Sequence, residues 1–397
     1  MQTTHPSICR NCLAFCPILV TVQDGRAVDV VGDPQSALYE GYSCPKGRAL
    51  PAQHNDPNRL LRCLRRGPRG LEPIDSAALA PEIGAKIAAL VAEHGPRSIA
   101  AYVGTGVVAH PTGAPMMAAF FRALGSPMVF SAATIDKPAA NTSTALHGNW
   151  IAGAQGFETA DVWMLVGANP VISRSNGAPY HNPNARLKEA AARGMKLIVV
   201  DPRRTETTRH AALHIQPRPG EDAALLAAMI HVVIAEKLHD GDFLARHAQG
   251  FEALAAAVAT MTPDWAAARA GVDASQIVEA ARLFARGKRG CVVCSTGASF
   301  STRSTLTFYL ALCLNTLCGR WAREGDFATY PNIMMPAFTP RAEAYAPYPV
   351  FGPQAMRVHG LRQNASGMPT SALADEILTE GEGRVRALFC IGGNPLE

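Results

Sequence analysis

Four cysteines in the first 44 residues have the spacing of a cluster-binding site. They are Cys9, Cys12, Cys16 and Cys44, so three lie close together and the fourth follows a longer segment. Four thiolates are the ligands of a [4Fe–4S] cubane. The alternatives are a structural zinc site, whose cysteines usually come as two C-x2-C pairs, and unrelated thiols that bind no metal. The asymmetric triplet departs from the zinc pattern, and the spacing therefore favours an iron–sulfur cluster.

The segment between the third and the fourth cysteine predicts a β-hairpin. Two alternating apolar runs flank Asp24-Gly25, a dipeptide typical of hairpin turns. This hairpin would space the fourth ligand from the first three. Lys46 follows Cys44 by two residues. It is either a solvated turn lysine or a positive group between the cluster and a second redox centre.

Two short motifs of the same type follow apolar strands more than two hundred residues apart. Gly167-Ala168-Asn169-Pro170 follows the run at 161–166, and Gly392-Gly393-Asn394-Pro395 follows another run near the end of the sequence. Glycine allows the backbone to approach a ligand, and asparagine offers both a donor and an acceptor. One copy alone is typical of a simple turn. Two copies predict two related halves, each of which holds half of a ligand.

Charged side chains follow one further predicted strand and precede a predicted helix. The run at 196–200 continues into Asp201-Pro202-Arg203, and Pro219-Gly220-Glu221-Asp222 precedes an apolar helix that begins near residue 223. A carboxylate at a strand end can accept hydrogen bonds from a ribose or a guanine edge, and arginines suit phosphates. The alternative is a charged surface loop. No Walker sequence is present, and Gly104-Thr105-Gly106 is too short for a dinucleotide fingerprint.

The elements that must position these residues alternate between strand and helix. We expect strands at 98–103, 128–130, 161–166 and 196–200, and helices at 78–93, 115–124 and 184–193. Such βαβ alternation predicts an α/β fold with parallel sheets, whose ligands bind at the carboxyl ends of the strands. The segment at 60–80 is rich in Arg, Gly and Pro and is predicted to be a linker.

The composition is that of a folded α/β chain. Of 397 residues, 48% are hydrophobic and 17% charged, which excludes disorder and collagen. The net charge of +5 decides little between an anionic cofactor and nucleic acid. The most apolar stretch, 223–235, is well short of the roughly twenty residues of a membrane span. The N-terminus has no apolar signal region and no twin arginine, so we expect a cytoplasmic protein without a direct membrane span.

Taken together, the motifs resemble the molybdopterin oxidoreductase superfamily, of the dimethyl sulfoxide reductase type with an N-terminal iron–sulfur module. The resemblance covers essentially the whole chain and rests on the four cysteines with Lys46, both Gly-x-Asn-Pro turns and the two charged motifs. Ser295-Thr296-Gly297 and Leu317-Cys318-Gly319-Arg320 also look like the family. It implies a small N-terminal β module followed by two Rossmann-like parallel-sheet domains.

The same resemblance implies a [4Fe–4S] cluster and a bis(molybdopterin guanine dinucleotide) cofactor with molybdenum or tungsten. The cluster ligands would be Cys9, Cys12, Cys16 and Cys44, with Lys46 between cluster and pterin. One guanine dinucleotide would be bound by Gly167, Asn169, Asp201, Arg203, Gly220 and Asp222. Gly297 would lie near the metal, and Gly392 and Asn394 would belong to the other half.

Four parts of the chain follow from this resemblance. Residues 1–60 would form the cluster module, and 61–155 an α/β segment near the active site. Residues 156–285 would form the domain that binds pterin guanine dinucleotide, and 286–397 the remainder of the α/β core. Because relatives usually continue through a further domain, we expect the sequence to be incomplete at its C-terminus.

The protein ligand of the metal is the point at which the sequence departs from the family. Many relatives supply Cys, selenocysteine, Ser or Asp after the strand near residue 130, but the segment 131–148 contains no cysteine. The candidates are Ser143, Thr142 and Asp136, and the metal can also lack a protein ligand. His147 is a candidate proton carrier, or a structural residue. The absent cysteine argues against an ordinary formate dehydrogenase or periplasmic nitrate reductase.

The remaining cysteines are expected to pack in the core. Cys291 and Cys294 lie in an apolar strand whose alternation would send the two thiols to opposite faces. Cys313 and Cys318 lie in an apolar helical run.

These patterns support an oxidoreductase that acts on a small-molecule substrate, not on nucleic acid. Electrons would pass through the chain's own cluster to an electron-transfer protein or subunit. The alternative is a non-catalytic electron-transfer or structural subunit that keeps the fold and the cluster but has lost the pterin. Both Gly-x-Asn-Pro turns, Asp201 and Asp222 are present, which favours the enzyme.

Overall fold

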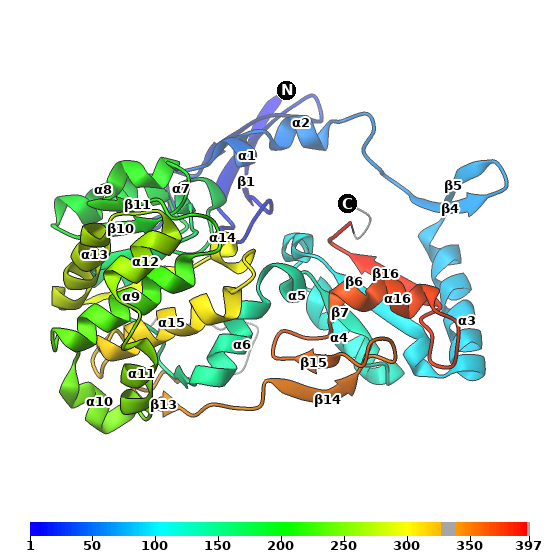
Figure 1. The fold of residues 1–397 in the computed structure, drawn as a ribbon. Helices are drawn as coiled ribbons and strands as arrows, with labels where there is room; N and C mark the ends of the chain where they lie inside the picture. Colours follow the sequence, from blue (N-terminus) through cyan, green and yellow to red (C-terminus); the bar gives the residue numbers. More distant parts are fainter. Residues whose placement is uncertain (327–338, 395–397) are drawn as a thin grey trace. The chain divides into compact units, whose positions relative to one another are not determined.

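The computed structural model describes residues 1–326 and 339–394 (Figure 1). Contacts divide the chain into two units. Unit 1 comprises Met1–Ile135, Pro353–Gln363 and Gly367–Glu397, and unit 2 comprises Asp136–Gly352 and Asn364–Ser366. The four parts expected from the sequence stay a prediction.

Unit 1 begins with a small antiparallel sheet that carries the cysteine loop. Strands β1 (Gln2–Ile8), β2 (Pro17–Gln23) and β3 (Arg26–Gly32) pair in the order β1-β2-β3. The predicted hairpin joins β2 to β3. Asp24 and Gly25 both have positive φ, 49° and 79°, as a tight two-residue hairpin turn requires. Two short helices follow, α1 (Pro45–Arg48) and α2 (Leu50–His54).

The segment predicted to be a linker contains a second hairpin. Strands β4 (Cys63–Gly67) and β5 (Gly70–Ile74) pair antiparallel across a short turn. The linker prediction is wrong here because Gly67 and Gly70 close a turn between two five-residue strands. Helix α3 (Ser76–His94) then starts at the N-cap Asp75, whose carboxylate accepts a hydrogen bond from the Ala77 N–H.

A parallel sheet forms the rest of unit 1. Strands β6 (Ile99–Val103), β7 (Val129–Ser131) and β16 (Ala387–Ile391) lie in the order β16-β6-β7. Apolar side chains of α3 and α4 (Gly113–Leu124) pack on one face of β6, and α16 (Leu373–Leu378) contributes to the core on the other face. The first and last strands of the α/β part are therefore neighbours.

Unit 2 contains a four-stranded parallel sheet, as the sequence predicts. Its strands are β9 (Val162–Val166), β10 (Lys196–Val200), β11 (Leu213–Ile215) and β12 (Gly290–Cys294), in the order β11-β10-β9-β12. Alternate residues face opposite sides. Val162, Met164 and Val166 pack against α9 (Asp222–Ala235), α13 (Ala274–Arg286) and α15 (Ser304–Leu317), whereas Trp163 and Leu165 pack against α8 (Pro183–Ala192).

The buried thiols follow the same alternation. Cys291 belongs to the core on the α8 side and Cys294 packs against the core on the α9 side, so the prediction of opposite faces is confirmed. Cys313 and Cys318 are buried among the α9 and α15 side chains. These four residues serve packing.

Shorter elements complete the description. The helices are α5 (Ala133–Asp136), α6 (Pro138–His147), α7 (Pro170–Ser173), α10 (Gly241–His247), α11 (Phe251–Val258), α12 (Pro263–Ala270) and α14 (Thr296–Ser299). The 3-10 helices are η1 (Pro96–Ser98), η2 (Thr105–Ala109), η3 (Phe157–Thr159), η4 (Glu206–His210) and η5 (Thr370–Ala372). Two small sheets pair β8 (Asn149–Trp150) with β13 (Ala344–Tyr345), and β14 (Phe351–Ala355) with β15 (Arg362–Asn364).

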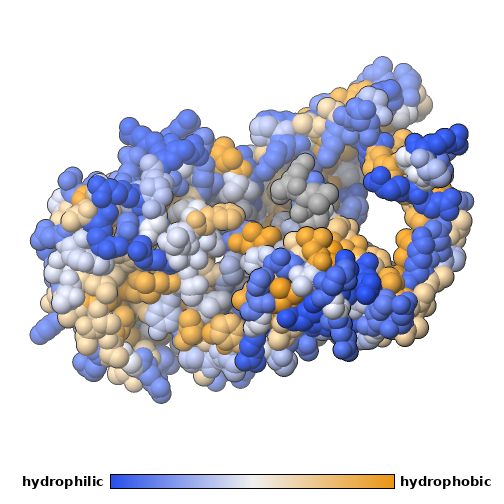
Figure 2. Space-filling view, turned by 45° about the vertical axis from the view of Figure 1, so that its right-hand side comes forward, coloured by the Kyte–Doolittle hydropathy of each residue, from blue (hydrophilic) through white to orange (hydrophobic). Residues whose placement is uncertain are grey.

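Helix length and surface hydropathy bear on membrane contact. Within the described ranges, no helix combines the length and the apolar character needed to cross a membrane. On the face shown in Figure 2, hydrophobic residues (orange) alternate with hydrophilic ones (blue).

Candidate cluster and cofactor sites

The four cysteines of the predicted cluster site lie on one loop and at the start of α1. Cys9 follows β1, Cys16 precedes β2, and the Cys9 N–H donates to the Cys16 carbonyl at 2.9 Å, which closes the loop between them. Cys44 is the N-cap of α1. Burial raises the pKa of Cys9, and burial together with the charges of the other three thiolates raises the pKa of Cys16 to about 11. The thiolates therefore repel one another and need a positive centre to stay ionised.

The side chains of the described residues form no ready site for a single metal ion. Across residues 1–326 and 339–394, no three His, Cys, Asp or Glu side chains are placed to hold one metal ion between them. In an iron–sulfur cubane each cysteine binds a different iron, so the sulfurs are farther apart than around zinc. The preference for a cluster over zinc rests on the spacing of the four cysteines.

Space for the cluster depends on Gly47. A Cβ atom at Gly47 would lie 3.4 Å from Cys9 Sγ and 2.8 Å from the Ser43 hydroxyl. A larger residue would crowd the sulfur. Lys46 is exposed, and its positive charge slightly opposes the rise in the pKa of Cys9.

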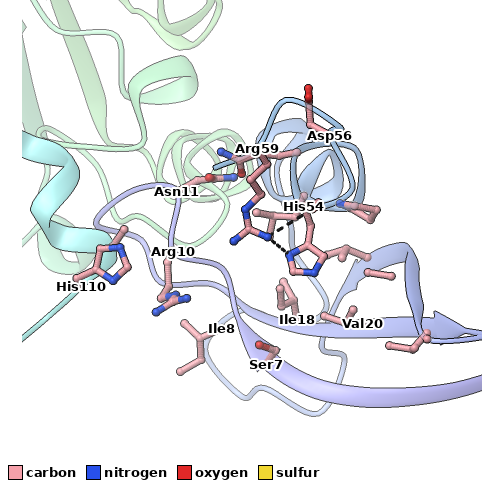
Figure 3. A pocket seen from close by; sticks show the side chains of 18 of the residues that line it. Ser7, Ile8, Arg10, Asn11, Ile18, Val20, His54, Asp56, Arg59 and His110 are labelled. Carbon is pink, nitrogen blue, oxygen red and sulfur yellow. Dashed lines mark hydrogen bonds between the residues drawn. The ribbon is translucent and has the colours of Figure 1, made fainter. Parts of the chain in front are cut away.

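A cavity of about 840 Å³ lies beside the cysteine loop in unit 1. Figure 3 shows Arg10 and Asn11 of that loop on its wall, with Ile18 and Val20 of β2 below. Arg59 Nη1 lies 2.8 Å from His54 Nδ1 at its rim. None of the four cysteines lines it.

At the carboxyl edge of the unit 2 sheet, two glycine turns touch. Gly167 follows β9 with φ 59°, and Gly297 lies in α14 directly after β12. The Gly297 N–H donates to the Gly167 carbonyl at 3.0 Å. A Cβ on Gly167 would lie 2.3 Å from the Ala298 nitrogen, and one on Gly297 would lie 2.8 Å from the Gly167 oxygen. Only glycine at both positions allows this contact.

The structure brings Asp201 and Asp222 together at the same edge. Asp201 follows β10, and its Oδ1 accepts the Arg203 N–H at 2.9 Å. Asp222 begins α9 and is 7% exposed. Burial, and then the negative charges of Asp201 and Glu221, raise the pKa of Asp222 to about 6. Glu221 is paired with Arg269 and Arg303, but no basic side chain among the described residues pairs with either aspartate.

Other predicted residues of this half have open surroundings. Gly220 has φ 90° and nothing within 4 Å of its ideal Cβ position, so it shapes the turn before Asp222. The Arg203 side chain is 65% exposed and lies 3.5 Å from Glu206 Oε2.

The Asn169 amide is held by two residues that the sequence analysis did not select. Its Nδ2 donates to Glu206 Oε2 at 2.7 Å, and the Thr207 hydroxyl donates to its Oδ1 at 2.7 Å. The hydrogen bond from Asn169 lowers the pKa of Glu206. Both residues follow the Asp201-Pro202-Arg203 motif closely, but their contact with a turn more than thirty residues earlier has no signal in the sequence.

Buried hydroxyls without partners lie beside these turns. Within the described part of the chain, the side-chain oxygens of Thr205, Ser299 and Ser301 have no hydrogen-bond partner. Thr205 follows β10, and the two serines follow β12. Unpartnered buried hydroxyls are costly. They fit a ligand rich in acceptor oxygens, such as a pyrophosphate.

Unit 1 repeats the glycine contact of unit 2. Gly392 follows β16 with φ 60°, and its carbonyl accepts the Gly106 N–H at 2.8 Å. A Cβ on Gly392 would lie 2.1 Å from the Val107 nitrogen, as one on Gly167 would collide with Ala298. Gly104-Thr105-Gly106 is therefore not a dinucleotide fingerprint, but it is the counterpart of Ser295-Thr296-Gly297. Asn394 follows this turn, and Pro395 lies outside the described residues.

The candidate metal ligands lie on or beside α6. Ser143 is 1% exposed, and its hydroxyl donates to the Ala140 carbonyl at 3.0 Å. Thr142 and Asp136 are half-buried. Of the three side chains, only that of Ser143 has a hydrogen bond to the helix backbone among the described residues.

His147 is bound through both ring nitrogens. Nδ1 lies 3.1 Å from the Gly148 carbonyl, which can only accept, so Nδ1 carries a proton. Nε2 lies 3.1 Å from the Thr316 hydroxyl, whose oxygen also accepts the Trp321 Nε1–H at 3.0 Å. Burial lowers the pKa of His147. Burial thus disfavours the charged form of the ring, whose two contacts join α6 to α15.

Comparisons with known proteins cover both halves of the chain. A family model described as molybdopterin oxidoreductase matches residues 75–397, and one described as the molybdopterin oxidoreductase Fe4S4 domain matches residues 2–56. The thiosulfate reductase molybdopterin-containing subunit PhsA of Salmonella typhimurium is 32% identical over 83% of this chain and 43% of that protein. Formate dehydrogenase H of Escherichia coli is 29% identical over 74% of this chain and 41% of that protein.

A solved structure is also similar. Acetylene hydratase from Pelobacter acetylenicus aligns with a TM-score of 0.71 and 25% identity, over 81% of this chain and 44% of that one. The chain thus spans less than half the length of the three proteins described.

Proposed function

This chain belongs to the molybdopterin oxidoreductase family, and on that premise we propose that it binds one [4Fe–4S] cluster and a bis(molybdopterin guanine dinucleotide) with molybdenum or tungsten. The family resemblance read from the sequence is confirmed. We propose further that the chain acts in the oxidation or reduction of a small molecule and passes electrons to a partner protein or subunit.

The observation that carries the proposal is the repeated glycine turn. In each unit, a Gly-x-Asn motif after a parallel strand touches a glycine after the neighbouring strand, Gly167 with Gly297 and Gly392 with Gly106. Ligands of open α/β sheets bind outside the carboxyl ends of the strands. Two equivalent turns support two similar ligand halves, as a cofactor with two dinucleotides has.

The residues of unit 2 fit a guanine dinucleotide in their chemistry. Asp201 and Asp222 offer carboxylate oxygens that would accept hydrogen bonds from the N–H groups of a guanine edge. Arg203 and the unpartnered hydroxyls of Thr205 and Ser299 would donate to phosphate oxygens. Glu206 and Thr207 would keep the Asn169 turn in place before the ligand arrives.

When bound, the metal would supply two-electron chemistry and the cluster would carry single electrons. This chain would hold the cluster through Cys9, Cys12, Cys16 and Cys44, with the Lys46 charge nearby. Among the metal-ligand candidates, Ser143 would have to release Ala140, whereas the side chains of Thr142 and Asp136 have no hydrogen bond to any residue that the structure describes. We assign His147 to the joining of α6 and α15.

Metal and pterin analysis of the anaerobically purified protein tests the proposal. We expect about four irons per chain, with molybdenum or tungsten and extractable guanine pterin. A Cys16→Ala variant serves as the matched control and is expected to lose iron. About four irons with neither pterin nor the heavier metal would instead support the non-catalytic electron-transfer subunit, and zinc without iron would overturn the cluster.

A further inference from the structure

One buried hydroxyl in the cysteine module has no partner. Ser43 directly precedes Cys44 and is 8% exposed. Its Oγ makes no hydrogen bond to any residue that the structure describes. Buried hydroxyls are nearly always hydrogen-bonded, and an unpartnered one points to a ligand that accepts.

The Ser43 hydroxyl and the Cys9 sulfur border the same small space. Ser43 Oγ lies 2.8 Å and Cys9 Sγ lies 3.4 Å from the point where a Cβ of Gly47 would be. The carbonyl groups of this segment already have donors, because Cys44 O accepts from Arg48 N, Pro45 O from Ala49 N, and Lys46 O from Asn11 Nδ2. The Cys9 sulfur is a further acceptor that borders this space.

We infer that the Ser43 hydroxyl donates a hydrogen bond to a sulfur of the cluster and thereby raises the reduction potential of that cluster. This inference rests on the cluster proposed above. Reduction adds negative charge to the cluster, so a donor aimed at its sulfur stabilises the reduced form more than the oxidised form. Lys46 acts in the same direction from an exposed position, where solvent screens it, whereas Ser43 acts from a buried one.

Three substitutions separate hydrogen bonding from shape. Ser43→Ala removes the hydroxyl, and Ser43→Thr and Ser43→Val have side chains of similar size that differ in whether they carry one. The readout is the midpoint potential of the cluster, from a redox titration of the purified protein followed by the electron paramagnetic resonance signal of the reduced cluster. We expect Ala and Val to shift the potential to more negative values and Thr to stay close to the unsubstituted protein.

A second signature and a control complete the experiment. Pulsed electron–nuclear resonance after exchange into deuterated water should show one exchangeable coupling in the unsubstituted and Thr proteins that is missing from the Ala and Val proteins. Couplings from backbone N–H groups, such as that of Asn11 to Cys9, should be present in all four proteins. Ser36→Ala is the control, because its hydroxyl accepts the Tyr39 N–H in a turn of the same module and should leave the potential unchanged.

The outcomes distinguish this inference from the proposed function. A cluster with the same potential and the same deuteron coupling in all three Ser43 variants would overturn the role of Ser43 and leave the cluster assignment in place. Absence of iron from the unsubstituted protein would overturn the cluster and this inference together.

Discussion

At the residue scale, both candidate sites contain acidic groups that resist ionisation. Burial is the main cause for Cys16 and for Asp222, and neighbouring thiolates or carboxylates add to it. An iron centre would remove the difficulty for the thiols, and a hydrogen-bond donor would remove it for the carboxylate. The raised pKa values of Cys16 and Asp222 therefore fit an iron centre at the first site and a hydrogen-bond donor at the second.

Asp222→Asn should change how the stability of the ligand-free protein depends on pH. The pKa of Asp222 is raised from 3.8 to about 6, so the folded chain holds this proton more tightly than the unfolded chain. Below pH 3.8 the Asp222 carboxyl group therefore leaves the free energy of unfolding unchanged. As the pH rises to about 6 it lowers this free energy progressively, and above that pH the loss is about 3 kcal/mol. We expect the Asn variant to have a higher Tm than the unsubstituted protein at pH 8.

That difference in Tm should shrink as the pH is lowered from about 6 towards 4. Glu221→Gln is the control, because Glu221 is paired with Arg269 and Arg303 and its loss should lower the Tm at pH 8. An equal Tm difference at pH 8 and at pH 4.5 would contradict the assigned burial of the Asp222 charge.

At the element scale, the buried strands were the most predictable part of the fold. The run at 196–200 coincides with β10, and the run at 161–166 exceeds β9 by one residue, because strands covered on both faces are continuously apolar. The hairpin of β4 and β5 was missed since arginine, glycine and proline dominate its sequence. The pairing of β16 with β6 has no local signal, because residues 104–386 separate the two strands.

Contacts between residues distant in sequence also limit what can be predicted of the candidate site. Asp201 and Asp222 are predictable candidates because one follows a recognisable strand and the other begins a helix, and the structure brings them to the same edge. Ser43, Glu206 and the Gly106 turn were not selected, because their roles depend on contacts with residues distant in sequence. The short Gly-Thr-Gly motif gained its meaning only from its contact with Gly392.

Arg320→Met should destabilise the end of helix α13. Arg320 is 2% exposed, and its Nη2 donates to the carbonyls of Phe284 and Gly287, with the guanidinium 5.2 Å from the Phe284 ring centre. Methionine would fill the space but leave these carbonyls without a donor. We expect the free energy of unfolding to fall by about 2 to 4 kcal/mol.

Thermal or urea unfolding followed by circular dichroism measures this loss. Arg286→Met is the comparison, because Arg286 is the exposed last residue of α13. It should change the free energy of unfolding by less than about 0.5 kcal/mol. Equal effects of the two substitutions would show that the Arg320 hydrogen bonds do not support the helix end.

At the scale of the whole molecule, the two units differ in how the chain builds them. Unit 2 is formed almost entirely by one continuous stretch, which includes all four strands of its sheet. Unit 1 needs β16 from the end of the sequence to complete the sheet around β6. The sheet of unit 1 can therefore be completed only when β16, near residue 390, is present.

A fragment of residues 136–352 should fold on its own. Both faces of its sheet are covered by helices from within the fragment, so we expect a helical circular dichroism spectrum and cooperative melting. Trp150, Trp163 and Trp321 are buried and should give a blue-shifted emission. A fragment of residues 1–135 lacks β16 and should not melt cooperatively. Random-coil spectra from both fragments would contradict the autonomy of unit 2.

The exposed thiol on β16 offers a native attachment point for a reporter. Cys390 lies two residues before Gly392 and is exposed, whereas Cys291, Cys313 and Cys318 are buried. Once a metal cluster protects the four N-terminal thiols, a mild maleimide dye or spin label should react first at Cys390. Its signal would then report events at the Gly392 turn without any engineered cysteine.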